Sequence, residues 1–375
     1  MPVPVYIDLL CTTPYRAVVA SKKRRSLVNP SPRGKRRKRL WWDRKSFDEL
    51  LDVRLCDLDL TLQGSTLQAR IDRLHEELRR AGLSFRPHVW LSTDWFTPDG
   101  VGGIAVPFFL AHKKLVQLEH TKMLEVEGGT QTWCMKLLRH ETGHAIDNAY
   151  RLHWKKKWRK TFGRFSEKYG SEYAPDPESR NFVHHLGYWY SQSHPAEDYA
   201  ESFAVWLRPG ARWRTRYKGW PVCKKLESLN EMMQSIAGEK PVVNSRARPD
   251  SLPTLKMTLR EYYEEKQQTY ADATPEAVDA YLFRLFSAGE DPSIKREKAA
   301  AFLWRFQIEL RNRIAHLTRQ PKYLVDQALD VLIVRCRELD LRVTRSTQES
   351  RVDATILLTI MTMRFVTGKR PRYRR

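Results

Sequence analysis

The chain of 375 residues has a formal net charge of +22 and is 41% hydrophobic and 11% aromatic. This composition can form a substantial core, which excludes disorder over the whole chain, and the length suffices for two domains. No stretch approaches the roughly 18–20 uninterrupted apolar residues that a membrane span needs, so we expect none. Residues 1–20 lack the basic and then apolar pattern of a secretory signal, which predicts a cytoplasmic location.

The positive charge is concentrated in dense basic runs: Lys22–Arg25, Lys35–Arg39, Lys155–Lys160 and Arg370–Arg375. Such runs are typical of solvated arms, and they also attract nucleic acid or acidic proteins without sequence specificity. The two interpretations have equal weight. The five cysteines are scattered, with no C-x-x-C pair, which predicts free thiols rather than disulfides or a thiolate metal site.

Residues 1–40 are predicted to form a disordered basic leader, with folded sequence from Trp41 onward. Apolar residues recur at helical spacing from Thr66 to Ala81, and Gly82 ends that helix. Strand-like segments separated by turn signals follow, at Pro87–Ser92, Gly103–Leu110 and Lys114–Glu119.

Gly128-Gly129 then breaks the pattern, and Thr130 is suited to cap a helix that we expect to reach about Tyr150. Further helices are predicted over 154–169 and from Pro195 to Leu207. In the first of these, Trp154, Trp158 and Phe162 alternate with basic residues; a buried stripe is favoured over a surface for stacking nucleic-acid bases.

Beyond residue 220 the sequence has helical periodicity and little strand signal. The predicted helical segments are 222–237, 255–271, 275–287, 294–317, 321–340 and 348–367. We therefore predict an α+β domain over 41–215 with a small, mostly antiparallel sheet. An all-helical C-terminal region with a basic tail follows over 216–375.

The residues that carry chemistry stand in the predicted helix over 130–150, as His140-Glu141-Thr142-Gly143-His144. Histidines four apart on a helix lie one turn above each other, so both imidazoles can bind one Zn²⁺. Glu141, beside the first ligand, is placed to act as general base towards a water that the metal activates. Asp147 shares the face of the two histidines, and we expect it to support them. Gly143 predicts a close approach of backbone or substrate, because glycine costs about 1 kcal/mol inside a helix.

A catalytic zinc needs a third protein ligand. The metzincin type is excluded, because Asp147 and Tyr150 stand where that motif requires glycine and histidine. The remaining candidates are His153, His184, His185, His194, Glu197, Asp198 and Glu201. Glu197 and Glu201 lie one helical turn apart, so one carboxylate can bind metal while the other steadies a ligand imidazole. An exposed acidic first turn, favoured by the helix dipole, explains the same pattern equally well.

The run His140-Glu141-x-Gly143-His144-Ala145-x-Asp147, with Tyr190 and Glu197-x-x-Ala200-Glu201-x-Phe203 after it, resembles the gluzincin-type catalytic domain of anthrax lethal factor. It is still more similar to a bacterial family of zinc-binding metallopeptidases, over about residue 85 into the 250s. The resemblance implies a zincin-like fold and Glu197 as the third zinc ligand. It also implies that Tyr190, seven residues earlier, supports the oxyanion. The helical part after about residue 270 is not covered, so the narrow substrate choice of lethal factor is not carried over.

We therefore expect a zinc metalloendopeptidase with one catalytic Zn²⁺, which hydrolyses peptide or protein substrates with Glu141 as general base. The strand Gly103–Leu110 is expected to offer an edge for an extended substrate. Two alternatives stay open. A nucleic-acid-associated SprT-like protease would use His184 or His185 in place of Glu197. A non-catalytic basic nucleic-acid-binding protein would hold zinc in a closed site of four ligands.

Overall fold

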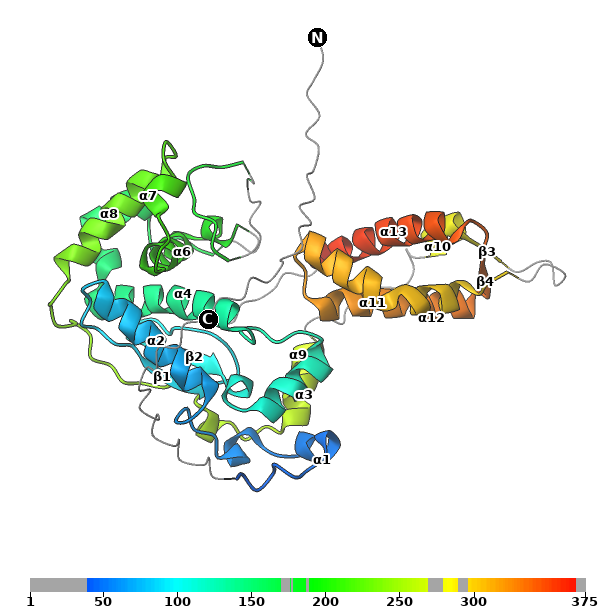
Figure 1. Ribbon diagram of the computed structural model, residues 1–375, viewed down its shortest axis with the longest axis horizontal. Coiled ribbons are helices and arrows are strands. Elements are labelled where there is room, and N and C mark those ends of the chain that lie inside the picture. The colour runs from blue at the N-terminus through cyan, green and yellow to red at the C-terminus, as the bar shows by residue number, and fades with distance from the viewer. Residues whose placement is uncertain are drawn as a thin grey trace, which may run out of the picture. The chain divides into compact units, whose positions relative to one another are not determined.

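The computed structural model describes residues 39–169, 176, 178–186, 189–268, 279–288 and 296–368. In these ranges the fold is mixed helical with few, short strands (Figure 1), which is compatible with the α+β class. The leader before Arg39 and the basic tail at 370–375 lie outside the described residues.

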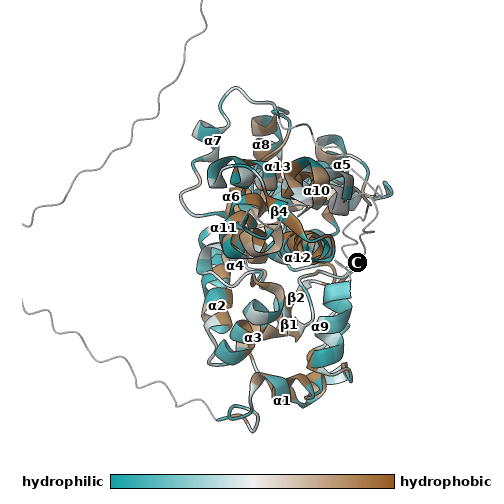
Figure 2. Cartoon of the chain, turned by 90° about the vertical axis from the view of Figure 1, so that its right-hand side faces the viewer, coloured by the Kyte–Doolittle hydropathy of each residue, from teal (hydrophilic) through white to brown (hydrophobic). Residues whose placement is uncertain are grey.

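The first helices are capped by serines. Ser46 forms a capping box with Glu49 at the start of α1 (Phe47–Leu51), and a 3₁₀ turn, η1, follows at Leu55–Leu58. Ser65 caps α2 (Thr66–Arg80) by accepting a hydrogen bond from the backbone of Gln68 at 3.1 Å. The predicted helix is confirmed, and teal and brown alternate along it in Figure 2, as expected of an amphipathic helix. Its buried side chains include Leu67, Ile71, Leu74 and Leu78.

Two strands follow, β1 (His88–Ser92) and β2 (Gly103–Pro107), and they pair in parallel, from His88 opposite Gly103 to Ser92 opposite Pro107. The prediction of a mostly antiparallel sheet is therefore wrong for this pair. Hydrophobic periodicity identifies a strand but does not report its direction, which depends on the path of the connection. Here the connection over 93–102 returns the chain to the start of its neighbour and forms one antiparallel bridge to β2, between Phe96 and Ala105.

The segment Lys114–Glu119 was predicted to be a strand, and this is wrong. After the 3₁₀ turn η2 (Phe108–Ala111), the chain forms helix α3 (Lys113–Met123). The imidazole of His112 caps it by accepting a hydrogen bond from the backbone of Lys114 at 3.3 Å. Leu115, Leu118 and Met123 are buried on one side of the helix, so a helical period was present in a run too short to distinguish it from a strand.

The central element is α4 (Gln131–Tyr150), capped as predicted by Thr130, whose side chain accepts a hydrogen bond from the backbone of Trp133 at 3.2 Å. Helix α6 (Pro195–Leu207) packs on one side of α4, while α2 and β2 contact it elsewhere (Figure 1). Between them lie the turn η3 (Leu152–Trp154), helix α5 (Lys156–Phe162) and the turn η4 (Tyr190–Gln192).

The hydrophobic core of this part extends beyond residue 215, from Trp42 to Tyr263. Helices α7 (Trp213–Arg216), α8 (Val222–Ser235) and α9 (Leu259–Gln268), with the turn η5 (Leu252–Thr254), all contribute buried side chains to it. The prediction placed 216–263 with the C-terminal helices because their periodicity is helical. Periodicity identifies the element, but not the core on which its apolar face packs.

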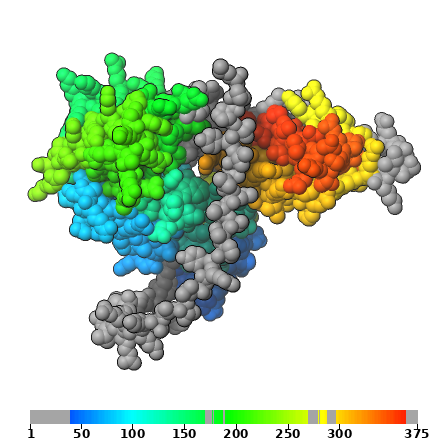
Figure 3. All heavy atoms as spheres, turned by 45° about the horizontal axis from the view of Figure 1, so that its top comes forward, coloured from blue at the N-terminus to red at the C-terminus, as the bar shows by residue number. Residues whose placement is uncertain are grey.

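A second core is formed by α10 (Asp279–Leu285), α11 (Ala299–Thr318), α12 (Lys322–Glu338) and α13 (Thr347–Gly368). These residues are coloured yellow to red in Figure 3. The region is not all helical: β3 (Phe286–Ala288) and β4 (Leu341–Val343) form a short antiparallel pair. Across the described ranges, no helix combines the length and hydropathy needed to cross a membrane. The described cysteines, Cys56, Cys134, Cys223 and Cys336, are free thiols.

Candidate metal centre

The two histidines of the HExxH motif lie on α4 and face α6. His140 is buried and His144 is partly buried, and their ring centroids are 4.9 Å apart. Nearly every residue of α4 from Cys134 to Tyr150 is buried, so this helix is held on several sides by its neighbours. The imidazoles therefore project from a rigid element rather than from an exposed surface helix.

Helix α6 brings Glu197 and Glu201 to the same place. His194 caps the helix by accepting a hydrogen bond from the backbone of Ala196 at 3.1 Å, and Pro195 occupies the first turn. Glu197 and Glu201 are only 5% and 1% exposed, which excludes the alternative of an exposed acidic first turn.

Gly143 allows α4 and α6 to approach each other closely. A Cβ atom at this position would lie 2.9 Å from the Cα of Ala200 and 3.3 Å from the Cβ atoms of Ala200 and Phe203. Atoms in ordinary van der Waals contact are roughly 3.5–4.0 Å apart, so no larger residue fits without moving one helix. The predicted close approach at Gly143 is thus a helix crossing.

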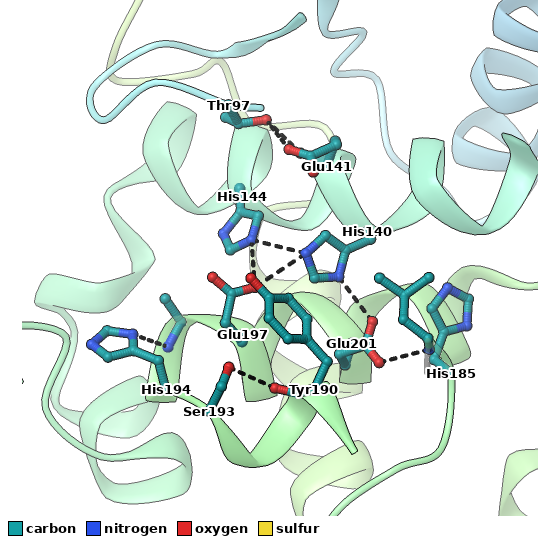
Figure 4. Close-up of polar contacts among 12 residues, drawn as sticks. Thr97, His140, Glu141, His144, His185, Tyr190, Ser193, His194, Glu197 and Glu201 are labelled. Atoms are coloured by element: carbon teal, nitrogen blue, oxygen red, sulfur yellow. Dashed lines mark hydrogen bonds and ion pairs between the residues drawn. The ribbon is translucent and has the colours of Figure 1, made fainter. Parts of the chain in front are cut away.

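Three ligand atoms meet at this crossing, as Figure 4 shows. The Nε2 atoms of His140 and His144 are 3.2 Å apart, and Glu197 Oε2 lies 3.2 Å from the first and 3.3 Å from the second. The three ligand atoms form a nearly equilateral triangle, supplied by two buried residues and the partly buried His144. His140, His144 and Glu197 can therefore hold one metal ion, and they are the only such group among the described residues.

Glu201 fixes the orientation of His140. Its Oε1 atom lies 2.9 Å from His140 Nδ1, and its Oε2 atom accepts a hydrogen bond from the backbone N–H of Leu186 at 2.8 Å. If Nδ1 carries the proton of a neutral imidazole, Nε2 is left with its lone pair directed at Glu197 and His144. This is the arrangement that a metal-binding histidine requires.

The charges within this group shift the pKa values of its members in the direction opposite to the shift caused by burial. Burial alone would lower the pKa of His140, but hydrogen bonds to Glu197 and Glu201 raise it well above its ordinary value. Burial would likewise raise the pKa of Glu197, but the nearby imidazoles hold it well below its usual range. The lowered pKa of Glu197 favours its ionised carboxylate, which is the form that binds a metal cation.

Glu141 is 7% exposed and lies beside the group without belonging to it. Its Oε2 atom accepts a hydrogen bond from the hydroxyl of Thr97 at 2.9 Å, as Figure 4 shows. Burial raises the pKa of Glu141, although His140, His144 and Thr97 act in the opposite direction. A carboxylate of raised pKa is a stronger base than an ordinary surface glutamate.

Tyr190 lies at the start of η4, and its ring is directed towards the two imidazoles and Glu197 (Figure 4). The ring centroids of Tyr190 and His140 are 5.8 Å apart, with the planes inclined by 42°. Its backbone carbonyl accepts a hydrogen bond from the side chain of Ser193 at 2.8 Å, which helps to fix the turn.

Asp147 was predicted to support the ligands, but the hydrogen bonds of its carboxylate to His153 lie outside the ligand group. Its carboxylate accepts hydrogen bonds from the backbone N–H and the Nδ1 of His153, both at 2.8 Å. The C-terminal end of α4 places the chain reversal after Tyr150 within reach of Asp147, which a purely helical projection does not reveal. Asp147 therefore anchors His153 and the turn that follows α4.

Neither His184 nor His185 belongs to the metal-binding group. His185 Nε2 lies 3.1 Å from the backbone carbonyl of Lys136, and burial lowers the pKa of His185 to about 4. His184 bonds through its backbone N–H to the hydroxyl of Tyr217 at 3.2 Å. His153 is held by Asp147, and Asp198 accepts from the ammonium of Lys225 at 2.5 Å.

Thr97 and Tyr169 contact the site and were not predicted. Thr97 hydrogen-bonds Glu141 from 44 positions away, and the hydroxyl of Tyr169 donates to Glu197 Oε1 at 2.7 Å from 28 positions away. Thr97 stands in the turn segment Thr97-Pro98-Asp99-Gly100, which is the one local signal that could have drawn attention to it.

Strand β2, which was predicted to pair with an extended substrate, already forms backbone hydrogen bonds at its middle residue. All residues of β2 are buried, and Ala105 exchanges backbone hydrogen bonds with Phe96, at 2.9 and 3.5 Å. Asn148 of α4 holds the same connection by donating to the carbonyls of Pro98 and Val101. An extended peptide could pair with this edge only after the 93–102 connection had moved.

The aromatic stripe of α5 is divided between core and surface. Trp158 is fully buried and Phe162 is 8% exposed, as predicted, but Trp154 is 62% exposed. The guanidinium of Arg151 lies 4.5 Å from the centroid of the Trp154 ring. The basic residues of the run Lys155–Lys160 are exposed, so this run forms a positively charged surface beside the core.

Comparisons with models of protein families, with curated proteins and with solved structures gave no match for this chain. The interpretation of the site therefore depends on its own geometry and chemistry.

Proposed function

We propose that the protein is a zinc-dependent peptidase of the gluzincin type, with His140, His144 and Glu197 as metal ligands. The observation that carries this proposal is the triangle of ligand atoms at 3.2, 3.2 and 3.3 Å. A tetrahedral zinc ion with bonds of about 2.0–2.1 Å separates its ligands by roughly 3.3–3.4 Å. The residues present thus fit zinc without rearrangement.

The composition of the donor set supports catalysis over a structural role. Structural zinc sites are closed by four protein ligands, mostly with cysteine, whereas catalytic sites have three and leave one position open. Within the described ranges, the group has three members and none is a cysteine. This speaks against the alternative of a basic nucleic-acid-binding protein with structural zinc.

Bound to these ligands, zinc would polarise the scissile carbonyl and acidify a water molecule. Glu141 would accept the proton of the attacking water through its carboxylate and later deliver it to the leaving amine. Thr97 holds the carboxylate of Glu141 in place at 2.9 Å. Tyr190, whose ring is directed at the metal-binding group, would donate from its hydroxyl to the oxyanion that develops in the transition state.

The SprT-like alternative requires a histidine in place of Glu197. His185 is hydrogen-bonded to Lys136, and His184 is not part of the group, so neither supports that ligand set. The basic run on α5 is still compatible with binding of nucleic acid or acidic proteins, as an activity separate from the metal site.

The test compares zinc-loaded wild-type protein with Glu141→Gln on a mixed peptide library and on an unfolded protein substrate. We expect the wild type to cleave peptide bonds and a chelator to stop it. Glu141→Gln should retain zinc and lose about 10²–10⁴ in rate, the typical contribution of a general base. Equal rates for the two proteins, or no cleavage by zinc-loaded wild type, would contradict the proposal.

A further inference from the structure

Tyr169 joins the metal-binding group from outside the HExxH and Glu-x-x-x-Glu patterns. Its hydroxyl donates to Glu197 Oε1 at 2.7 Å, and its ring stacks on the imidazole of His194, with centroids 3.7 Å apart and planes inclined by 11°. The residue lies after α5, beside the start of α6, and is 39% exposed.

The surface on which Tyr169 stacks is itself fixed at both nitrogens. His194 Nδ1 accepts from the backbone N–H of Ala196, and its Nε2 lies 2.9 Å from the backbone carbonyl of Glu167. Because Nδ1 is an acceptor, Nε2 carries the proton and donates it to that carbonyl. His194 is 5% exposed, so its imidazole is held in one orientation and sets the position of the tyrosine ring.

The two oxygens of Glu197 consequently have different partners. Oε2 faces the Nε2 atoms of His140 and His144, at 3.2 and 3.3 Å, while Oε1 accepts from Tyr169. A carboxylate ligand binds a metal through one oxygen or through both, and zinc can expand from four to five ligands. The hydrogen bond from Tyr169 to Oε1 opposes binding through both oxygens, because Oε1 would have to give up this hydrogen bond to bind the metal.

We propose that Tyr169 is a positioning residue that keeps Glu197 a one-oxygen ligand, so that the remaining position of the metal stays open for water or substrate. The inference rests on the metal ligands named under the proposed function. Tyr169 and Tyr190 have different roles, because the hydroxyl of Tyr169 donates to Oε1 of Glu197, whereas the ring of Tyr190 is directed towards the two imidazoles.

The test uses the full chain with Tyr169→Phe, which keeps the stacking on His194 and removes only the hydroxyl. The control is Tyr150→Phe, which also removes a phenol hydroxyl; that hydroxyl hydrogen-bonds the backbone carbonyl of Glu239 at 2.9 Å and the side chain of Ser84, and no metal ligand. Co²⁺ replaces zinc as a probe, because the intensity of its visible d–d bands decreases when four-coordination becomes five-coordination. Zinc affinity is measured separately by competition with a chelator, and circular dichroism verifies folding.

We expect Tyr169→Phe to show weaker cobalt bands than the wild type and a zinc affinity lower by about 10–100-fold, as is usual when support of a ligand is lost. Tyr150→Phe should match the wild type in both. An unchanged cobalt spectrum in Tyr169→Phe overturns the proposal whatever its zinc affinity, as does a wild type that binds neither metal. Both readouts are independent of turnover. A wild type that binds cobalt and cleaves no peptide would therefore contradict the peptidase function and leave this test valid.

Discussion

Because α4 and α6 cross closely at Gly143, we predict that a single methyl group at this position weakens metal binding, although Gly143 is not a ligand. In Gly143→Ala the new Cβ would lie 2.9 Å from the Cα of Ala200, a backbone atom that cannot turn away. Restoring a normal contact of about 3.5 Å requires a shift of roughly 0.6 Å between the helices. Ala200 lies between Glu197 and Glu201 on α6, so the shift carries both carboxylates away from the histidines.

The expected change in the free energy of unfolding is the sum of two opposing effects. Overpacking of a core costs about 1–3 kcal/mol, and alanine gains about 1 kcal/mol over glycine in a helix. We therefore expect the free energy of unfolding of the metal-free protein to fall by about 0–2 kcal/mol. Zinc affinity should fall more clearly, by about 10–100-fold, because the ligand triangle is widened. Gly143→Ser should exceed Gly143→Ala in both effects.

Urea unfolding of the metal-free protein and chelator competition for zinc measure the two quantities. The control is Gly102→Ala, where the new methyl meets the ring of Phe85 at 3.1 Å, a side chain that can yield, and the Cβ of Ala149 at an ordinary 3.4 Å, with no atom of α6 among its nearest neighbours. This variant should bind zinc like the wild type. If Gly143→Ala also bound zinc like the wild type and lost no stability, the role assigned to the helix crossing would be refuted.

Three further outcomes follow from the site. Glu197→Ala should lower zinc content strongly and Glu201→Ala less, since only the first supplies a ligand atom; stoichiometric zinc in Glu197→Ala would exclude it as a ligand. Tyr190→Phe should keep zinc and lose about 10²–10³ in kcat with little change in KM, and near-wild-type turnover would mean that Tyr190 only packs. Burial lowers the pKa of His185 from 6.5 to about 4, so the folded state disfavours its protonation. The contribution of His185 to the unfolding free energy of the metal-free protein should therefore fall between pH 6.5 and 4, by up to about 3 kcal/mol, whereas the raised pKa of Asp198 acts in the opposite direction over this range. Relative to the wild type, His185→Gln should gain stability as the pH falls from 6.5 to 4; an unchanged pH dependence would contradict this.

Local patterns predicted the parts of the site that lie within one element. Each of these features depends on one helix alone: the cap at Thr130 and the spacing of His140 and His144 on α4, and the one-turn spacing of Glu197 and Glu201 on α6. The residues of this segment alone could not decide whether Glu197 was exposed in a helix start or was a buried ligand, and only the resemblance favoured the ligand. That difference depends on the packing of α6 against α4, which the residues of α6 alone do not report.

The contacts that were missed are long-range. Thr97 and Tyr169 reach the site from irregular segments, where no periodicity links a side chain to a partner 44 or 28 positions away. The same limit explains the errors in the fold. The parallel pairing of β1 with β2 depends on the path of the chain over 93–102. The run Lys114–Glu119 was too short for its helical period to be distinguished from a strand.

The most direct test of the metal centre is anomalous diffraction at the zinc edge from crystals of the zinc-loaded full chain. We expect one zinc ion with bonds of about 2.0–2.2 Å to the Nε2 atoms of His140 and His144 and to Glu197 Oε2, with no fourth protein ligand. A histidine in place of Glu197, or a fourth protein ligand that closes the site, would contradict it.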